Sequence, residues 1–329
     1  MLSMKRNGIN TAICKIENGK YKGKFIFLEK EGIVSESESE SDDDDEIMDI
    51  PFDYDELKKH DLMKPYKGNE RKRKIAKVRN FLSGKRSRNR KMDDFTRKAK
   101  KIRRIITKKE IKLGKGDGRI KLIPNTKERE VLYVGGKSGM GKSWLAGEYS
   151  KKYKKMYPDN PIYMFSRKKE DPSIDQFVDV ERFDIDDDLV NDPIDFVEEL
   201  VADNDGCLVI FDDCNTLQDK KIKEACLALQ NDCLEVGRDK KVNMVVTSHK
   251  LSDHKNTKTI LSECHYIIVN PSAAPRVLQY TLSEHVGLSN KQINRIKKLK
   301  KKTRWVAIYK DHPTHVIYEK GAYICEDKE

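Results

Sequence analysis

Short apolar blocks alternate with longer amphipathic stretches from Glu130 to about Asn270. The apolar blocks predict strands at 131–134, 162–165, 207–211, 242–247 and 266–269. The stretches between and beside them predict helices at 142–156, 193–202, 220–236 and 257–263. Strands that are buried on both faces of a parallel sheet have continuous apolar runs, as these do. The pattern therefore predicts an α/β domain in which helices flank a parallel sheet.

The chain before this region has two other patterns. Apolar and polar positions alternate at Tyr21–Leu28, which predicts a small hairpin or an edge strand. Apolar residues recur at helical intervals at 71–82 and 94–106, on a strongly basic background. These two predicted helices would bind an anionic partner or remain solvated.

The chain after Asn270 is short and again basic. A helix is expected at 289–300, followed by a hairpin of strands at 304–309 and 315–323. Segment 291–304 contains eight basic residues and no acidic one. We therefore expect a small basic helix and hairpin at this end.

The net charge of +12 is distributed unevenly along the chain. Residues 1–70 carry 11 Lys and Arg against 17 Asp and Glu, a net charge of −6. Residues 71–112 carry 20 Lys and Arg against 3 Asp and Glu, a net charge of +17. The net charge of residues 113–329 is therefore +1. The run at 35–46 has no apolar side chain to offset the entropy lost on ordering, so it predicts a disordered acidic linker.

A chain of 329 residues is long enough for one large α/β domain with appended segments. We expect a β-like N-terminal segment, an acidic linker, a basic helical arm, the α/β domain, and a C-terminal helix and hairpin. Their predicted bounds are 1–34, 35–50, 51–112, 113–270 and 271–329.

The cysteine count and the hydropathy limit where the protein is expected. The seven cysteines are odd in number and none has CxxC spacing, so neither a disulfide framework nor a zinc site is predicted. No stretch approaches the roughly 18 apolar residues of a membrane span, and no apolar signal-peptide core follows the start. We therefore expect an intracellular protein in a reducing compartment, without a membrane partner.

A glycine-rich loop directly follows the apolar block at 131–134. It consists of Gly136, Lys137, Ser138, Gly139, Met140, Gly141, Lys142 and Ser143, and a predicted helix comes next. This order of strand, GxxxxGK[ST] loop and helix is typical of a phosphate-binding loop. Its backbone amides can surround phosphate oxygens, Lys142 supplies an ammonium group, and the Ser143 hydroxyl can bind Mg²⁺. We predict that the loop binds ATP with Mg²⁺.

Two acidic residues follow the apolar block at 207–211. Asp212 and Asp213 lie about 70 residues after the glycine-rich loop. We predict that Asp212 holds Mg²⁺, and that Asp213 orients and polarises the attacking water. The alternative is that either aspartate only caps the next turn. A further polar run, Ser166–Lys169, follows the second strand and would contact phosphate or DNA, or form a solvated turn.

Together with these motifs, Gly237–His249 resembles the FtsK–HerA family of DNA-pumping ATPases. Within that family the chain resembles the genome-packaging ATPases of nucleocytoplasmic large DNA viruses, from about 130 to 270. The segment is similar to the family's Gly-Arg, short turn and strand ending in Thr-Gln. The resemblance implies a RecA-like (ASCE) P-loop NTPase fold and ATP hydrolysis coupled to translocation of double-stranded DNA.

The resemblance also implies roles for two residues of this segment. Arg238 falls at the position of an arginine finger that reaches the neighbouring subunit's nucleotide, and otherwise would be a surface salt-bridge residue. His249 falls at the position of the polar sensor, although Ser248-His249 replaces Thr-Gln, so Ser248 or Thr247 is an alternative sensor. The second acid is aspartate, as in viral members, where cellular relatives have glutamate.

The expected partners follow from the basic segments and from the resemblance. Double-stranded DNA would contact 71–112 and 291–304 through phosphate interactions that do not depend on sequence. The arm could instead be a nuclear-targeting or capsid-docking tail. The resemblance implies a homo-oligomeric ring, a capsid or portal-type partner, and a location in a viral factory of the host cytoplasm or in the virion.

Other functions remain open at this point. A P-loop helicase or a replication-associated ATPase would need further motifs or a DNA-reading module after Asn270. A nucleotide-binding virion or nucleoprotein scaffold would not need a water-polarising acid such as Asp213. A nucleotide kinase would need an acceptor pocket and a lid.

Overall fold

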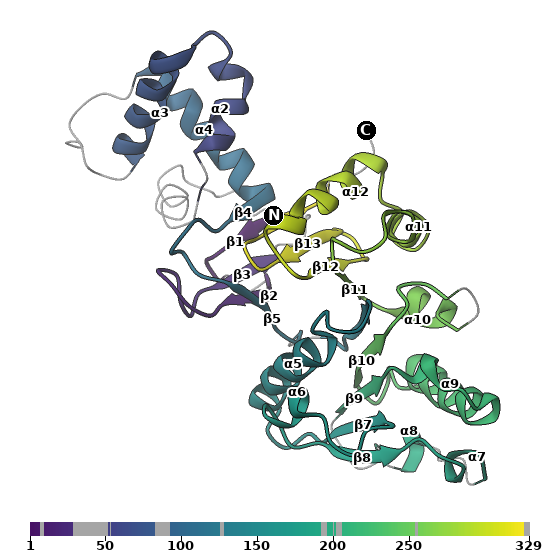
Figure 1. The fold of residues 1–329 in the computed structure, drawn as a ribbon. Coiled ribbons are helices and arrows are strands. Elements are labelled where there is room, and N and C mark those ends of the chain that lie inside the picture. The colour runs from purple at the N-terminus through teal and green to yellow at the C-terminus, as the bar shows by residue number, and fades with distance from the viewer. Residues whose placement is uncertain are drawn as a thin grey trace. The chain divides into compact units, whose positions relative to one another are not determined.

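The computed structural model describes most of the chain in two compact units (Figure 1). One unit comprises Met1–Lys121 with Lys320–Ile324, and the other comprises Leu122–Glu319 with Cys325–Glu329. The structure describes residues 1–6, 10–28, 52, 54–82, 93–125, 128–191, 196–199, 201, 206–253 and 256–325. The predicted acidic linker lies outside these described residues.

The larger unit is built on a mixed, largely parallel sheet. Its strand order is β13-β12-β11-β6-β10-β9-β7-β8, and the strands from β11 to β8 are parallel. The strands are β6 (Val131–Gly135), β7 (Ile162–Ser166), β8 (Glu181–Asp184), β9 (Cys207–Asp212), β10 (Val242–Ser248), β11 (Tyr266–Val269), β12 (Val306–Tyr309) and β13 (His315–Tyr318). Every residue of β6, β7, β9 and β10 is buried, which explains their continuous apolar sequences.

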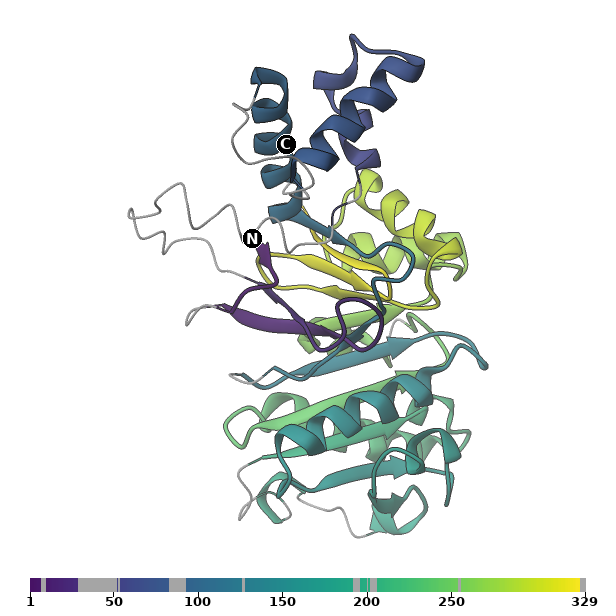
Figure 2. The ribbon, with the colours of Figure 1, turned by 90° about the vertical axis from the view of Figure 1, so that its left-hand side faces the viewer.

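Helices cover both faces of the parallel strands. Figures 1 and 2 show α5 on one face, whereas α9 lies on the other. The helices of this unit are α5 (Lys142–Met156), α6 (Pro172–Asp175), α7 (Asp188–Asn191), α8 (Phe196–Glu199), α9 (Lys220–Glu235), α10 (Lys258–Glu263), α11 (Pro275–Glu284) and α12 (Asn290–Lys297), with short 3-10 helices η2 (Cys214–Thr216) and η3 (Lys298–Lys301). The prediction of an α/β fold with a parallel sheet is confirmed for this part of the chain.

The C-terminal strands extend the sheet rather than standing apart from it. β12 pairs antiparallel with β11, with Ile267 opposite Ile308, and β13 pairs antiparallel with β12. The local pattern predicted strands at 304–309 and 315–323 but not their sheet partner. The second prediction is corrected, because that range holds two strands, β13 and a further strand at Gly321–Ile324, with a turn between them. The short strand β8 was not predicted, because its sequence Glu-Arg-Phe-Asp is half exposed and contains no apolar run.

The smaller unit combines short strands with basic helices. β1 (Leu2–Ser3), β3 (Phe25–Leu28), β2 (Thr11–Ile16) and β5 (Ile120–Leu122) form one sheet in that order, and β4 (Glu110–Lys112) pairs with β14 (Gly321–Ile324). The helices are α2 (Asp55–Lys59), η1 (Asp61–Met63), α3 (Gly68–Leu82) and α4 (Asp94–Lys109).

The basic helices of this unit enclose a small apolar core. Its buried members are Leu57, Met63, Ile75, Val78 and Ala99. The predicted basic helices are therefore packed on one another and are not only solvated faces. The finer division of the sequence into five segments stays a prediction.

Candidate nucleotide-binding site

β6 carries the glycine-rich loop to the carboxyl edge of the parallel strands. The Gly136 N–H donates to the carbonyl of Ser248 at the end of β10, at 2.9 Å. Gly139 and Gly141 have φ values of +78° and +81°, a region that favours glycine, and a Cβ at either would meet nothing within 4 Å. The loop thus presents bare backbone to open space just before α5 begins at Lys142. This is the geometry in which backbone amides and a helix N-terminus bind phosphate.

Asp212 and Asp213 lie at the same edge, at the end of β9. The Thr247 hydroxyl donates to Asp212 Oδ1 at 2.8 Å and lies 3.4 Å from Asp213 Oδ1. Asp213 adopts a left-handed backbone conformation with φ 54°. For a residue other than glycine this conformation costs roughly 1–3 kcal/mol and is common at functional sites. Its N–H donates to the Thr247 hydroxyl oxygen at 3.1 Å, which holds the two adjacent strand ends together.

Two groups with the capacity for positive charge contact Asp213. Lys142 Nζ lies 3.6 Å from Asp213 Oδ1, and the Lys142 side chain is 8 % exposed. His249 Nε2 lies 2.9 Å from Asp213 Oδ2. The structure therefore brings together Lys142, Asp212, Asp213 and His249 from three different strand ends. Ser248, the alternative sensor, accepts a hydrogen bond from the Asn215 side chain at 2.7 Å.

Lys168, at the end of β7, also belongs to this cluster. Its Nζ lies 2.8 Å from Asp171 Oδ2 and 3.5 Å from Asp212 Oδ2. Burial disfavours the charge on Lys168, but the contacts with Asp171 and Asp212 outweigh it and raise the pKa of the lysine. The sequence signal was the polar run Ser166–Lys169, which pointed to this edge but did not identify Lys168 or Asp171.

Asp171 is linked to the glycine-rich loop as well. Burial raises the pKa of Asp171, but Lys168, the Ser173 N–H and the Ser143 hydroxyl together hold it below the usual value. Asp171 also caps α6, since its Oδ1 accepts the Ser173 N–H at 2.9 Å. The carboxylate therefore has a fixed position beside Ser143.

The donor set fits one divalent cation bound together with phosphate. Asp212 Oδ2 is buried and accepts no hydrogen bond from the residues that the structure describes. Within the same residues, no group of three or more His, Cys, Asp and Glu could hold a metal ion. Mg²⁺ normally keeps several waters and uses few protein ligands beside phosphate oxygens. Ser143 and Asp212 could hold Mg²⁺ on those terms.

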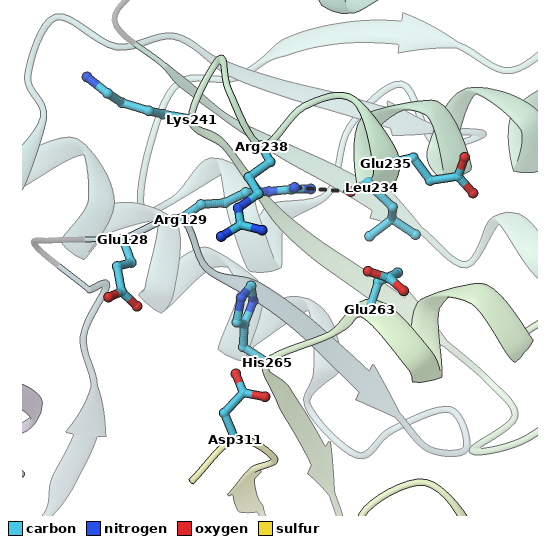
Figure 3. A pocket seen from close by; sticks show the side chains of 9 residues that line it. All are labelled: Glu128, Arg129, Leu234, Glu235, Arg238, Lys241, Glu263, His265 and Asp311. Carbon is cyan, nitrogen blue, oxygen red and sulfur yellow. Dashed lines mark hydrogen bonds between the residues drawn. The ribbon is translucent and has the colours of Figure 1, made fainter. Parts of the chain in front are cut away.

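Arg238 lies at the opposite edge of the sheet, in the turn between α9 and β10. The turn borders a pocket of about 590 Å³ with both acidic and basic walls (Figure 3). The pocket is lined by Glu128, Arg129, Leu234, Glu235, Arg238, Lys241, Glu263, His265 and Asp311. The seven-residue strand β10 separates this edge from His249 by about 20 Å. The structure does not bring Arg238 to the glycine-rich loop of the same chain.

Arg129 ties together the two ends of the Arg238 turn. Its guanidinium donates to the carbonyls of Cys233 at 2.7 Å, Leu234 at 3.0 Å and Val242 at 2.7 Å. The first two carbonyls belong to the end of α9 and the third to the start of β10. Burial lowers the pKa of Arg129, although nearby groups partly offset this. No sequence pattern indicated this role of Arg129, because all three partners are main-chain atoms more than 100 residues away.

Comparison with curated proteins gives a viral relative. The chain is 36 % identical over 208 residues to "Uncharacterized protein V3" of Sputnik virophage, covering 63 % of this chain and 81 % of that protein. No protein-family model matches the sequence.

Solved structures similar to this chain include an NTPase and an ATPase, all at low sequence identity. The genome packaging NTPase B204 of Sulfolobus turreted icosahedral virus 2, in complex with ATP-gammaS, is 16 % identical with a TM-score of 0.39, covering 59 % of this chain and 98 % of that chain. The cytoplasmic domain of the Type VII secretion ATPase EccC of Thermomonospora curvata is 11 % identical with a TM-score of 0.42, covering 67 % and 29 %. The pCW3 conjugation coupling protein TcpA is 12 % identical with a TM-score of 0.39, covering 96 % and 77 %.

Of the helices in the described ranges, none combines the length and the apolar character needed to cross a bilayer.

Proposed function

The chain belongs to the family of protein V3 of Sputnik virophage, and from this viral relationship together with the site geometry we propose that it is an ATP-hydrolysing motor that translocates double-stranded DNA and packages a viral genome. The observation that carries the proposal is the convergence of three strand ends on one edge of the sheet. There the glycine-rich loop meets Asp212, Asp213 and His249. Open α/β sheets bind ligands at this edge.

We infer that the glycine-rich loop, from Gly136 to Ser143, holds the phosphates of ATP. Lys142 would leave Asp213 and pair with the β- and γ-phosphates, since a phosphate offers a stronger, less buried charge partner. Ser143 and Asp212 would hold Mg²⁺. When bound, Mg²⁺ would neutralise part of the phosphate charge.

Asp213 has the position expected of the group that handles the attacking water. A new bond would form between the water oxygen and the γ-phosphorus, while the bond to the bridging oxygen breaks and ADP leaves. Asp213 would orient the water and accept its proton, then return that proton to solvent or phosphate. His249, 2.9 Å from Asp213, would hold the carboxylate and sense the loss of the γ-phosphate.

The position of Arg238 supports a ring rather than a monomer. An arginine at the amino edge cannot reach its own chain's phosphates across β10, but a neighbouring subunit could place it there. An arginine finger supplied in this way offsets the charge of the transition state. In the proposed ring each site is completed by the next subunit's Arg238.

The basic helices are the proposed DNA contacts. α12 buries Ile293 and Ile296, which leaves Lys291, Arg295 and Lys298 exposed on the other side. α3 and α4 lie in the segment of charge +17 at 71–112. Contacts of this type bind DNA without sequence preference, as translocation requires.

ATP hydrolysis by the full-length protein tests the proposal. We expect that long duplex DNA stimulates hydrolysis, that the stimulation decreases as salt concentration rises, and that Lys142→Ala abolishes the activity. Lys155→Ala, an exposed lysine in the last turn of α5, is the matched control and should retain it. Hydrolysis that ignores DNA would contradict the motor, and ATP binding without turnover would instead favour a nucleotide-binding scaffold. Strand separation on forked DNA would favour a helicase.

A further inference from the structure

A lysine that the proposed reaction does not use lies against the metal-binding end of the site. Lys168 Nζ is 3.5 Å from Asp212 Oδ2, the oxygen that accepts no hydrogen bond from the described residues. The Asp212 side chain is only 1 % exposed, so a charge on its carboxylate requires compensation within the protein. Among the residues that the structure describes, Lys168 is the ion-pair partner of Asp212.

Asp171 gives Lys168 a second, independent partner. The Lys168 ammonium lies 2.8 Å from Asp171 Oδ2, closer than to Asp212. Asp171 is itself fixed, because it caps α6 through the Ser173 N–H and its own N–H donates to Asp175 Oδ2 at 2.7 Å. The lysine can therefore lose Asp212 and remain paired.

The same end of the site is where Ser143 and Asp212 would hold the metal. Two cations compete for one carboxylate oxygen, because each repels the other at short distance. The Lys168 side chain is 53 % exposed, so it has room to move away from Asp212. These facts make Lys168 a competitor of the metal.

We propose that Lys168 is a resident counter-ion of the metal-binding carboxylate. Its ammonium pairs with Asp212 Oδ2 while no divalent cation is bound, and withdraws to Asp171 once Asp212 is engaged by one. The inference rests on the proposed nucleotide site. Lys168 is in this view a positioning residue: it orients Asp212, and it lowers the affinity of the site for the metal.

The size of the effect follows from the exposure of the lysine. Ion pairs that involve half-exposed side chains are worth little, so removal of Lys168 should tighten metal binding by roughly two- to fivefold. The same change should lower the thermal midpoint of the protein without ligands, since Asp212 then loses its counter-charge.

Direct metal binding tests the inference. Mn²⁺ binding to the full-length protein in the presence of ADP is measured by the loss of the free Mn²⁺ signal in electron paramagnetic resonance. We expect Lys168→Met and Lys168→Gln to lower the Mn²⁺ dissociation constant by the factor given above, and Lys168→Arg to keep the wild-type value. Lys169→Met, the exposed neighbouring lysine, is the matched control.

Thermal unfolding supplies a second readout. Lys168→Met should unfold at a lower temperature than Lys169→Met without ligands, and saturating Mn²⁺ with ADP should close that gap. An equal or weaker Mn²⁺ affinity in both neutral variants, with wild-type ADP binding intact, overturns the inference and leaves the proposed function standing. A wild-type protein that binds neither ADP nor Mn²⁺ with ADP overturns the proposed function and the inference with it.

Discussion

The two edges of the parallel sheet differ in how their charged side chains are satisfied. At the carboxyl edge the charged groups meet within one chain: Lys142 and His249 contact Asp213, and Lys168 contacts Asp212. At the amino edge Arg238 is exposed, and the structure shows no hydrogen bond or ion pair of its side chain with a described residue. The carboxyl edge thus satisfies its charged groups within one chain, whereas the amino edge presents a cation outward. In the proposed ring, this cation would complete the site of a neighbouring subunit.

The largest effect is expected from removing the outward cation. Arg238→Ala should reduce hydrolysis by on the order of 10³ or more in the assembled protein, while ADP binding is retained, because in the proposed ring the arginine would act on a neighbour's transition state. The measurement is steady-state ATPase activity together with ADP affinity of the purified assembly.

Mixing two inactive variants tests whether Arg238 acts on the site of a neighbouring subunit or on the site of its own chain. Lys142→Ala subunits still offer Arg238, and Arg238→Ala subunits still have Lys142, so a mixed ring contains interfaces with both. We expect the mixture to regain part of the activity that each variant lacks alone. If the mixture remains as inactive as its components, Arg238 of one subunit does not complete the nucleotide site of another.

The position of Arg238 can also be disturbed by a substitution at another residue of the amino edge. Arg129→Lys keeps a positive charge, but its single ammonium nitrogen cannot reproduce the planar spread of three guanidinium nitrogens over three carbonyls, so the turn that carries Arg238 should lose its fixed position. We expect the maximal rate to fall roughly tenfold, in line with the loss of hydrogen bonds from a charged group, while the KM for ATP stays unchanged.

Complementation tells a positioning role from a general loss of stability. Arg129→Lys subunits keep Lys142, so mixing them with Lys142→Ala subunits, which offer a correctly held Arg238, should restore activity. Mixing them with Arg238→Ala subunits should not, because neither variant offers a well-placed arginine. Equal success with both partners would show that Arg129 does not act through Arg238.

The two edges also differ in how far the sequence predicted them. The glycine-rich loop, Asp212 and His249 each follow an apolar strand, and the carboxyl ends of neighbouring parallel strands meet at one edge. Their proximity therefore followed from local pattern and sheet geometry. The pair Lys168 and Asp171 did not, because its relation to Asp212 depends on β7 lying beside β9 and on where a long side chain reaches.

The amino edge was hardest to predict. Arg129 bonds main-chain carbonyls of distant residues, and a carbonyl has no sequence signature. Likewise, the pairing of β12 with β11 joins segments whose own patterns gave strands but no partner. The periodicity of apolar residues thus predicted which segments are strands or helices. Which distant strands pair with one another could be seen only in the folded structure.

At the carboxyl edge an effect much smaller than that of Arg238→Ala is expected from His249. His249→Ala removes the contact with Asp213 and should slow hydrolysis roughly tenfold, with little change in ATP affinity. His249→Gln, which keeps a donor in reach of the carboxylate, should stay within about threefold of the wild type. Single-turnover hydrolysis measures both variants. An alanine variant with unchanged rates would make His249 a loop residue without a part in the reaction.

The last prediction concerns Glu130, beneath the amino edge. A change there should alter the stability of the fold and leave the activity almost unchanged. Glu130 Oε2 accepts from the Tyr149 hydroxyl at 2.7 Å and from the Asn125 N–H at 3.2 Å, but burial dominates and raises the pKa of Glu130 from 4.5 to about 7. Between these values the unfolded chain releases a proton that the folded chain keeps, so unfolding becomes easier as pH rises.

The free energy of unfolding should therefore fall by about 3 kcal/mol between pH 4.5 and pH 7 on account of this carboxyl alone. Glu130→Gln keeps the acceptor but cannot ionise, so its unfolding free energy should lack this part of the pH dependence. Urea unfolding at several pH values measures the difference, and Glu224→Gln, an exposed carboxyl on α9, serves as the control. If wild type and Glu130→Gln show parallel pH profiles, the carboxyl beneath the amino edge is already ionised in the folded protein.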